Sequence, residues 1–317
     1  RGSGNMQQKR EIGRSGIRIA PLVLGGNVFG WNADQATSSA VLDAFVDGGG
    51  DAIDTADVYS AWVPGHKGGE SESVIGAWLK QSGKRNKVVI CTKVGMLPTR
   101  LGIKRQNIID ACEDSLKRMG IDTIDLYWLH RDDEATDADE FTGALDALLK
   151  AGKIRSFGAS NFKPARFAEA LVAAKKAGVR YDAQQPEYNL LNREIEAELV
   201  PICEREGVSI LPYYSLANGY LTGKYRSEAD KTKSLRGGRM DKYMQGKGPA
   251  VLAVLDDIAA RTRATPAQIA LAWVMAKLPT GAPIASATSA KQLRELMGAL
   301  NVTLSADDVA ALDRVSV

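Results

Sequence analysis

Residues 124–160, IDLYWLHRDDEATDADEFTGALDALLKAGKIRSFGAS, contain the pattern that decides the fold. The segment begins with a short apolar run, 124–130, that is rich in β-forming side chains. A polar turn follows, and then the stretch 137–151, in which apolar residues recur at helical spacing. A second β-rich run, 154–160, ends the segment. A strand, a helix and another strand in this order indicate two parallel strands joined by a crossover helix.

The same alternation of strand and helix recurs along most of the chain. Eight strands, each followed by a helix, predict a closed parallel barrel, whereas about six would favour an open doubly wound sheet. We therefore expect an α/β fold, a (β/α)8 TIM barrel with an N-terminal β-hairpin near residues 9–20 and extra C-terminal helices. The expected strands are 22–24, 52–54, 88–93, 124–130, 154–160, 183–185, 209–213 and 283–285. The expected helices are 34–48, 70–82, 104–119, 137–151, 164–177, 193–206, 249–277 with a break at Pro266, 289–300 and 305–315.

Charge and composition narrow the possible classes of protein. The 317 residues carry 41 Lys and Arg against 38 Asp and Glu, interspersed, which gives a formal net charge of +3. This balance does not favour a nucleic-acid or membrane surface. No apolar run approaches the roughly 18 residues of a membrane-spanning helix, and no signal peptide is visible. We therefore expect a globular cytoplasmic protein with neither nucleic acid nor membrane as a partner; its oligomeric state is open.

The cysteines and the chain ends add two further expectations. Cys91, Cys112 and Cys203 lack any CxxC spacing, which argues against a disulfide framework or a zinc site and fits buried thiols in a reducing compartment. Residues 1–5 (RGSGN) are expected to be an expression remnant ahead of a native Met6. Residues 6–317 are then one barrel domain. Within it, residues 216–248 form the longest irregular segment, and such a segment is usually a lid, a binding loop or disordered.

Polar side chains follow the apolar runs of most expected strands. The carboxyl ends of barrel strands meet at one face, where the active sites of such enzymes lie. Any one of these residues is most often a satisfied hydrogen-bonding group, but so many together indicate a functional site. The residues are Asp54, Lys93, His130, Ser160 with Asn161, Gln184 with Gln185, and Tyr213.

An Asp, a Tyr, a Lys and a His at neighbouring strand ends form an acid–base set. The pKa of a phenol is near 10, and a nearby ammonium such as Lys93 is expected to lower that of Tyr59 toward the working range. Asp54 fits the counter-charge that keeps Lys93 protonated. His130 can then orient a carbonyl oxygen. Taken alone, Tyr59 is more often an aromatic residue at the rim, and His130 a structural hydrogen-bonding group.

Other sites are not favoured. His66 and His130 match no ligand spacing, so no metal is expected. Residues 219–224 (GYLTGK) resemble a phosphate loop, but the spacing is one residue short and Tyr225 stands where Ser or Thr is needed. There is no GxSxG motif, and no G-x-G-x-x-G follows a strand, so a Rossmann cofactor site is not expected.

The chain resembles the aldo-keto reductases over nearly its whole length. Such a series of matches in this order is very specific. The matching segments are 51–59 (DAIDTADVY), 69–76 (GESESVIG), 92–93 (TK), 115–122 (SLKRMGID), 126–130 (LYWLH), 152–161 (GKIRSFGASN), 185–189 (QPEYN), 221–225 (LTGKY) and 292–295 (QLRE).

The resemblance implies an acid–base tetrad and an extended NADP(H) site without a Rossmann fold. The tetrad falls on Asp54, Tyr59, Lys93 and His130, the residues that the chemistry also selects. The implied cofactor residues are Ser160, Asn161 and Gln185 for the carboxamide, Tyr213 for the nicotinamide ring, Leu216, Gly219 and Lys224 for the pyrophosphate, and Ser286, Thr288, Gln292 and Glu295 for the adenosine end.

Two departures from the family leave the cofactor preference open. Many NADPH-selective members carry a basic residue where Ser286 and Gln292 stand, although others have Gln at the second position. Glu295 is followed by Leu296, where the family often has an Asn that contacts the adenine. The resemblance favours NADP(H), with NAD(H) as the alternative.

Aromatic residues in loops or near strand ends are candidates for the substrate pocket: Trp31, Trp62, Trp128 and Tyr188. Any one of them is as often a core residue. An aromatic pocket would suit an aldehyde, a ketone or a sugar, and the insertion 61–68 (AWVPGHKG) is expected to form one wall. Two other functions stay open. One is an NAD-dependent secondary-alcohol or sugar dehydrogenase, and the other a slow-turnover, cofactor-sensing regulatory subunit like the barrel subunits of potassium channels.

Overall fold

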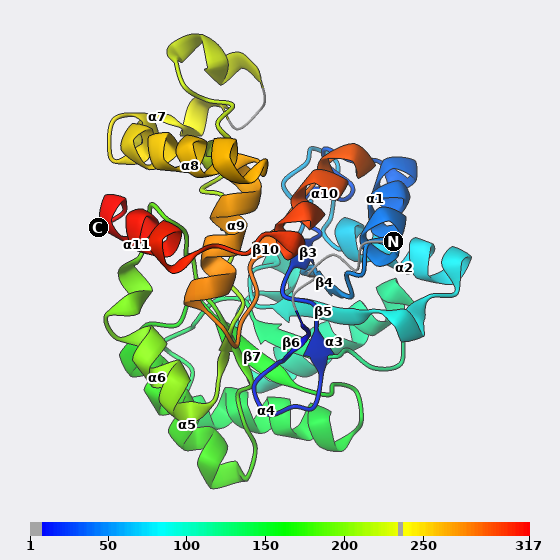
Figure 1. Cartoon of the computed structure of the whole chain (residues 1–317). Helices are drawn as coiled ribbons and strands as arrows, with labels where there is room; N and C mark the ends of the chain where they lie inside the picture. Colours follow the sequence, from blue (N-terminus) through cyan, green and yellow to red (C-terminus); the bar gives the residue numbers. More distant parts are fainter. Residues whose placement is uncertain (1–7, 234–236) are drawn as a thin grey trace.

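The computed structural model describes residues 8–233 and 237–317, so the expected remnant 1–5 lies outside the described residues. A single parallel sheet forms the centre of the molecule, with strand order β10-β3-β4-β5-β6-β7-β8-β9 (Figure 1). From β3 to β9 each strand pairs with the next in sequence, and the last strand, β10, pairs with the first, β3, as a barrel requires. The strands are β3 (Val23–Gly25), β4 (Ala52–Asp54), β5 (Val89–Val94), β6 (Leu126–Leu129), β7 (Phe157–Ser160), β8 (Ala183–Gln185), β9 (Ser209–Ile210) and β10 (Ile284–Ala285).

Main-chain hydrogen bonds also join the two ends of this strand order. The amide of Ala282 donates to the carbonyl of Ile210 at 3.2 Å, and that of Ile284 donates to Pro212 at 3.0 Å. Pro212 has no N–H of its own, which explains why β9 ends before the expected residue 213. The predicted (β/α)8 barrel is confirmed.

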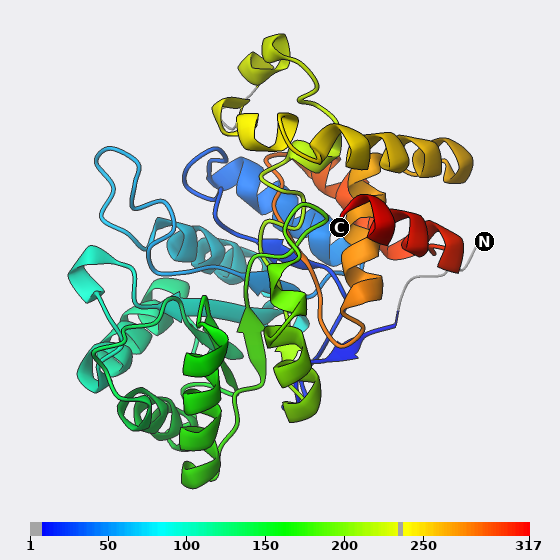
Figure 2. The same ribbon diagram turned by 90° about the vertical axis from the view of Figure 1, so that its left-hand side faces the viewer.

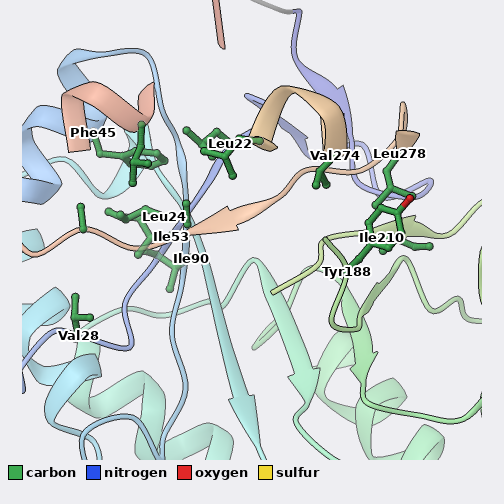
Figure 3. Packing of buried hydrophobic residues seen from close by; sticks show 14 of the residues in the cluster. Leu22, Leu24, Val28, Phe45, Ile53, Ile90, Tyr188, Ile210, Val274 and Leu278 are labelled. Carbon is green, nitrogen blue, oxygen red and sulfur yellow. The ribbon is translucent and has the colours of Figure 1, made fainter. Parts of the chain in front are cut away.

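Helices surround the barrel and bury its outer face. Figure 3 shows Leu24, Ile53 and Ile90, from the neighbouring strands β3, β4 and β5, close to Phe45 of the first helix. Burial of these apolar surfaces is the main contribution to the stability of the fold. The helices of the barrel are α1 (Gln35–Asp47), α2 (Glu70–Ser82), α3 (Arg105–Met119), α4 (Ala138–Lys150), α5 (Pro164–Ala177), α6 (Leu199–Glu206), α8 (Gly248–Thr262), α9 (Pro266–Lys277), α10 (Ala290–Met297) and α11 (Ala306–Val315).

Two expected helices are interrupted. The break at Pro266 is confirmed, because Thr265 and Gln268 form a capping box that begins α9 anew. The expected helix 193–206 is a 3-10 turn, Glu194–Glu196, followed by the shorter α6. Pro201 is tolerated in the first turn of α6, but its ring would clash with an earlier helical turn.

The predicted N-terminal hairpin closes one end of the barrel. Strands β1 (Arg10–Glu11) and β2 (Arg18–Ile19) pair antiparallel. Ile12, Ile17 and Ile19 are buried in one cluster with residues of the barrel interior, among them Trp128. Because this hairpin also contacts the beginning of β9, where Ser209 accepts from the Gly13 amide at 2.8 Å, it covers the amino ends of the strands. The carboxyl ends lie at the opposite face.

The segment 216–248 is more ordered than expected. It contains the 3-10 turns Tyr220–Thr222, Glu228–Lys233 and Gly237–Arg239 and the short helix α7 (Asp241–Met244). Figures 1 and 2 both show its yellow-green part extending outward beyond α8. Residues 234–236 of this segment lie outside the described residues. Across the described part of the chain, no helix is both long and apolar enough to cross a membrane.

Candidate active site

The parallel register brings the carboxyl ends of β4, β5 and β6 together. Asp54 ends β4 and pairs in register with Cys91 of β5, two residues before Lys93. Lys93 pairs with Trp128 of β6. Successive strand residues alternate between the barrel interior and the helices, so Asp54, Lys93 and Trp128 can meet inside the barrel.

Lys93 is the centre of the acid–base set. Its ammonium donates to Oδ2 of Asp54 at 2.6 Å, to the main-chain oxygen of Thr55 at 2.9 Å and to the Tyr59 hydroxyl at 2.7 Å. These contacts use its three N–H donors. Since an ammonium cannot accept, the Tyr59 oxygen is the acceptor, and the phenolic hydrogen remains available to another group.

Burial and the neighbouring groups together determine the pKa values of Lys93 and Tyr59. Lys93 is 0% exposed, and burial alone would lower the pKa of its ammonium, but the negative charge of Asp54 and the hydrogen bonds to Asp54 and Tyr59 outweigh burial and raise that pKa. Burial raises the pKa of Tyr59, and the opposing charge of Lys93 does not overcome it. The expectation that Lys93 brings the pKa of Tyr59 below its ordinary value is therefore wrong for this state of the protein. The phenol is a protonated donor at neutral pH.

His130 lies beside the Tyr59 ring. The two ring centroids are 5.9 Å apart, with the planes at 84°. Burial, together with the positive charges of Lys93 and Arg131, lowers the pKa of His130 well below its usual value. Its Nδ1 is buried and finds no hydrogen-bond partner among the described residues. The imidazole is therefore neutral at neutral pH, and one side can act as a hydrogen-bond donor.

A second hydrogen-bonded group lies beside the tetrad, at the ends of β7 and β8. Ser160 donates to the main-chain oxygen of Gln185 at 2.8 Å, and the Gln185 amide donates to Oδ1 of Asp54 at 3.4 Å. The hydroxyl of Tyr213 donates to Oδ1 of Asn161 at 2.6 Å. The Asn161 amide is exposed, and the Tyr213 ring is half-buried. An exposed amide beside a partly exposed ring fits a planar carboxamide-bearing ligand such as nicotinamide.

The loop after β9 has an unusual backbone. Tyr214, Ala217 and Asn218 all have positive φ, as does Gly219 at 94°. The Asn218 amide donates to the Tyr243 hydroxyl at 2.8 Å, which ties the loop to α7. Strained backbone of this kind often marks a ligand site. The structure places Leu216 partly buried against the core, Gly219 half-buried and Lys224 exposed.

The remaining expected cofactor residues lie around the beginning of α10. Ser286 donates to Oδ1 of Asn27, a residue that follows β3. The Thr288 amide and hydroxyl donate to Oε1 of Gln292, at 2.8 and 3.2 Å. The side chain of Glu295 is exposed. This region presents polar groups, and none of these four side chains is basic.

The four aromatic candidates for the substrate pocket separate into two pairs. Trp31 and Trp62 meet edge to face at 5.4 Å, and Trp62 lies 6.3 Å from the Tyr59 ring. Trp62 is 49% exposed. These two residues lie beside the tetrad, where a substrate could contact them.

Trp128 and Tyr188 do not form a pocket wall. Trp128 is fully buried inside the barrel and donates its indole N–H to Oδ1 of Asp54 at 2.8 Å. Tyr188 is buried, stacks on Trp273 of α9 at 5.3 Å, and lies among Ile210 and Leu278 in Figure 3. Both are interior residues, because their side chains point into the barrel or toward a helix rather than toward the carboxyl-end face.

Three contributors to the site were not predicted from the sequence. Thr55 supplies a main-chain oxygen to Lys93. Asn27 accepts from Ser286. Ser60, directly after Tyr59, is fully buried with φ of 73°. Of these, Asn27 alone carried a signal, as a polar residue directly following an expected strand and two glycines.

Known proteins are similar to this chain over nearly its whole length. The Aldo/keto reductase family model matches residues 21–317. The chain is 32% identical over 316 residues to the uncharacterized oxidoreductase YrpG of Bacillus subtilis, covering 96% of this chain and 94% of that protein. It is 29% identical over 315 residues to an aryl-alcohol dehydrogenase of Pestalotiopsis microspora (94% and 79%). It is 31% identical over 315 residues to a probable voltage-gated potassium channel subunit beta of Oryza sativa (93% and 92%).

The α/β barrel fold and the match to a family of oxidoreductases together place the chain among the barrel oxidoreductases. The chain belongs to the Aldo/keto reductase family. Members of this family act on small carbonyl compounds and generally use nicotinamide cofactors.

Proposed function

We propose that this protein transfers a hydride between NADP(H) and a small carbonyl or alcohol substrate, with Tyr59 as the general acid in reduction and the general base in oxidation. The observation that carries the proposal is the contact of one buried ammonium, Lys93, with both Asp54 and Tyr59, at 2.6 and 2.7 Å. This arrangement leaves the phenolic hydrogen free to move to a substrate oxygen.

The residues of the tetrad would act on the carbonyl oxygen. Tyr59 donates its proton to that oxygen as negative charge develops, and the adjacent Lys93 ammonium stabilises the phenolate that remains. Asp54 keeps Lys93 charged. Neutral His130 orients the oxygen by a hydrogen bond. In oxidation, the Tyr59 phenolate takes the alcohol proton.

The cofactor site would lie between the ends of β7, β8 and α10. A bound reduced nicotinamide supplies the hydride that reaches the carbonyl carbon. Ser160, Asn161 and Gln185 would hold its carboxamide and Tyr213 its ring. Leu216, Gly219 and Lys224 would line the pyrophosphate, and Ser286, Thr288, Gln292 and Glu295 the adenosine end.

The preference for NADP(H) over NAD(H) rests on the family. The polar but non-basic groups at Ser286 and Gln292 keep NAD(H) as the alternative. Titration of the purified protein with NADPH and with NADH, followed by cofactor fluorescence, compares the two dissociation constants directly. Tighter binding of NADPH supports the proposal, and tighter binding of NADH would assign the protein to NAD-dependent chemistry.

Substrate would contact Trp31 and Trp62, which lie beside Tyr59. Their edge-to-face pair presents an apolar surface that suits an aldehyde, a ketone or the apolar face of a sugar. A panel of such compounds, assayed in both directions by cofactor absorbance, tests the activity. Turnover of at least one carbonyl compound with NADPH is expected.

Two alternatives follow from the relatives. The aryl-alcohol dehydrogenase favours a protein that works mainly by oxidation, which the same panel with alcohols and oxidised cofactor would show. The potassium channel subunit favours a slow, cofactor-sensing role. Tight cofactor binding with no turnover across the whole panel would support that role and contradict the enzyme proposal.

A further inference from the structure

Ser60 has a backbone conformation that serine rarely adopts. Its φ is 73°, in the left-handed region that favours glycine or asparagine, and it directly follows Tyr59. A non-glycine residue stays in this region only when its surroundings hold it there. Ser60 is fully buried, so the contacts that hold it are made inside the protein.

Two contacts that involve side chains hold the Ser60 turn, beside the main-chain hydrogen bond from the Val63 amide to the Ser60 oxygen at 3.2 Å. Its hydroxyl donates to the main-chain oxygen of Phe29 at 2.7 Å. Its main-chain oxygen lies 2.9 Å from Nδ1 of His66. A carbonyl can only accept, so Nδ1 carries the hydrogen and donates it. Oε1 of Glu70 lies 3.6 Å from the same nitrogen, and this carboxylate oxygen favours a hydrogen there.

These contacts connect the two loops that flank Tyr59. Phe29 belongs to the loop between β3 and α1 that also carries Trp31, and His66 belongs to the insertion 61–68 that carries Trp62. The Trp31 and Trp62 rings contact each other edge to face, with their centroids 5.4 Å apart. Ser60, which directly follows Tyr59, is therefore hydrogen-bonded to both loops.

We propose that Ser60 is a positioning residue for Tyr59: its left-handed turn, fixed by its hydroxyl on Phe29, directs the phenol toward Lys93. The inference rests on the proposed role of Tyr59 as the proton donor. A glycine would adopt the turn without strain but would lack the hydroxyl. The presence of serine at a position that suits glycine is thus explained by the bond to Phe29.

Two variants separate the hydroxyl from the backbone. Ser60→Gly keeps the left-handed turn accessible and removes the hydroxyl, so Tm falls only by the loss of one buried hydrogen bond, and KM stays near wild type. We expect kcat to fall about tenfold or more, because small displacements of a reacting group are costly. The basic limb of the pH profile for reduction shifts to higher pH, since a phenol farther from Lys93 loses its stabilising charge. A merely structural role would not move that limb.

The matched control for Ser60→Ala is Ser156→Ala, at the other end of the barrel. Ser156, 1% exposed, donates to the main-chain oxygen of Asp125 at 2.6 Å, just before β7. Both alanine variants should lower Tm, and Ser60→Ala alone should lower kcat. The assay uses the aldehyde of the panel that is reduced fastest, with NADPH.

The proposal is overturned if Ser60→Gly has wild-type kcat and an unshifted pH profile, or if Ser60→Ala affects Tm alone, as Ser156→Ala does. This failure differs from failure of the proposed function. In that case Tyr59→Phe would itself turn over like the wild type, whatever the Ser60 variants do.

Discussion

Trp128 donates its indole N–H to Oδ1 of Asp54 at 2.8 Å from inside the barrel, while Lys93 contacts the other oxygen of the same carboxylate. The carboxylate is thus held from two sides. Trp128 therefore holds Asp54 in place and does not line the substrate pocket.

Trp128→Phe removes this donor from a buried carboxylate. We expect a loss of about 1–3 kcal/mol in the free energy of unfolding and a several-fold lower kcat, because Asp54 is left with a poorly satisfied oxygen. Denaturant unfolding and steady-state kinetics measure the two effects. Trp78→Phe is the control, since Trp78 donates to Asp43 at 2.9 Å between α1 and α2, away from the site. Equal loss of kcat in both variants would contradict a specific role.

Lys93→Met leaves the Asp54 carboxylate buried without its counter-charge. Lys93 and Asp54 are 0% and 2% exposed, so we expect about 3–5 kcal/mol lower stability together with loss of turnover. Adding Asp54→Asn removes the uncompensated charge. The double variant should therefore regain much of the stability and none of the activity, as a double-mutant cycle would measure. Additive stability losses would argue against the buried ion pair.

His130 should make stability depend on pH. Its pKa in the folded protein is well below the usual 6.5, so below about pH 6.5 the unfolded chain binds more protons than the folded one. The contribution of neutral His130 to the free energy of unfolding is fully present above that pH and is lost as pH falls. Tm of the wild type should decline more steeply from pH 7.5 to 5 than Tm of His130→Asn, with His66 unchanged in both. Parallel curves would show that the pKa of His130 is not lowered in the folded protein.

Trp62→Ala tests the proposed substrate surface. Trp62 is 49% exposed, so its removal should leave Tm nearly unchanged. KM should rise about tenfold, as the loss of roughly 1.5 kcal/mol of aromatic contact implies. Val172→Ala, at 62% exposure on α5, is the control and should leave KM unchanged. A wild-type KM for Trp62→Ala would remove Trp62 from the substrate site.

Much of the fold could be predicted because its signals are local. Helices α2 and α5 begin and end as predicted, and each is ended by a glycine in the left-handed conformation, Gly83 and Gly178. Strands β4 (AID) and β8 (AQQ) also match their expected bounds. The contact of Asp54 with Lys93 follows from the same pattern, since strand order alone brings strand ends together.

The rest depends on three-dimensional surroundings that a single sequence does not contain. Whether Trp128 faces the barrel interior or a pocket depends on strand orientation, and Tyr188 is buried because α9, from far along the chain, covers it. The pKa of Tyr59 stays high because burial outweighs Lys93, and burial is set by the whole fold. No residue type signals the left-handed turn at Ser60.

Turnover of Tyr59→Phe, measured beside its affinity for NADPH, bears most directly on the proposed chemistry. The substitution removes one hydroxyl and keeps the ring in place. We expect kcat for carbonyl reduction to fall by roughly 10²–10⁴-fold, the usual contribution of a general acid, with an unchanged Kd for NADPH. Reduction at a rate close to that of the wild type would show that another group supplies the proton.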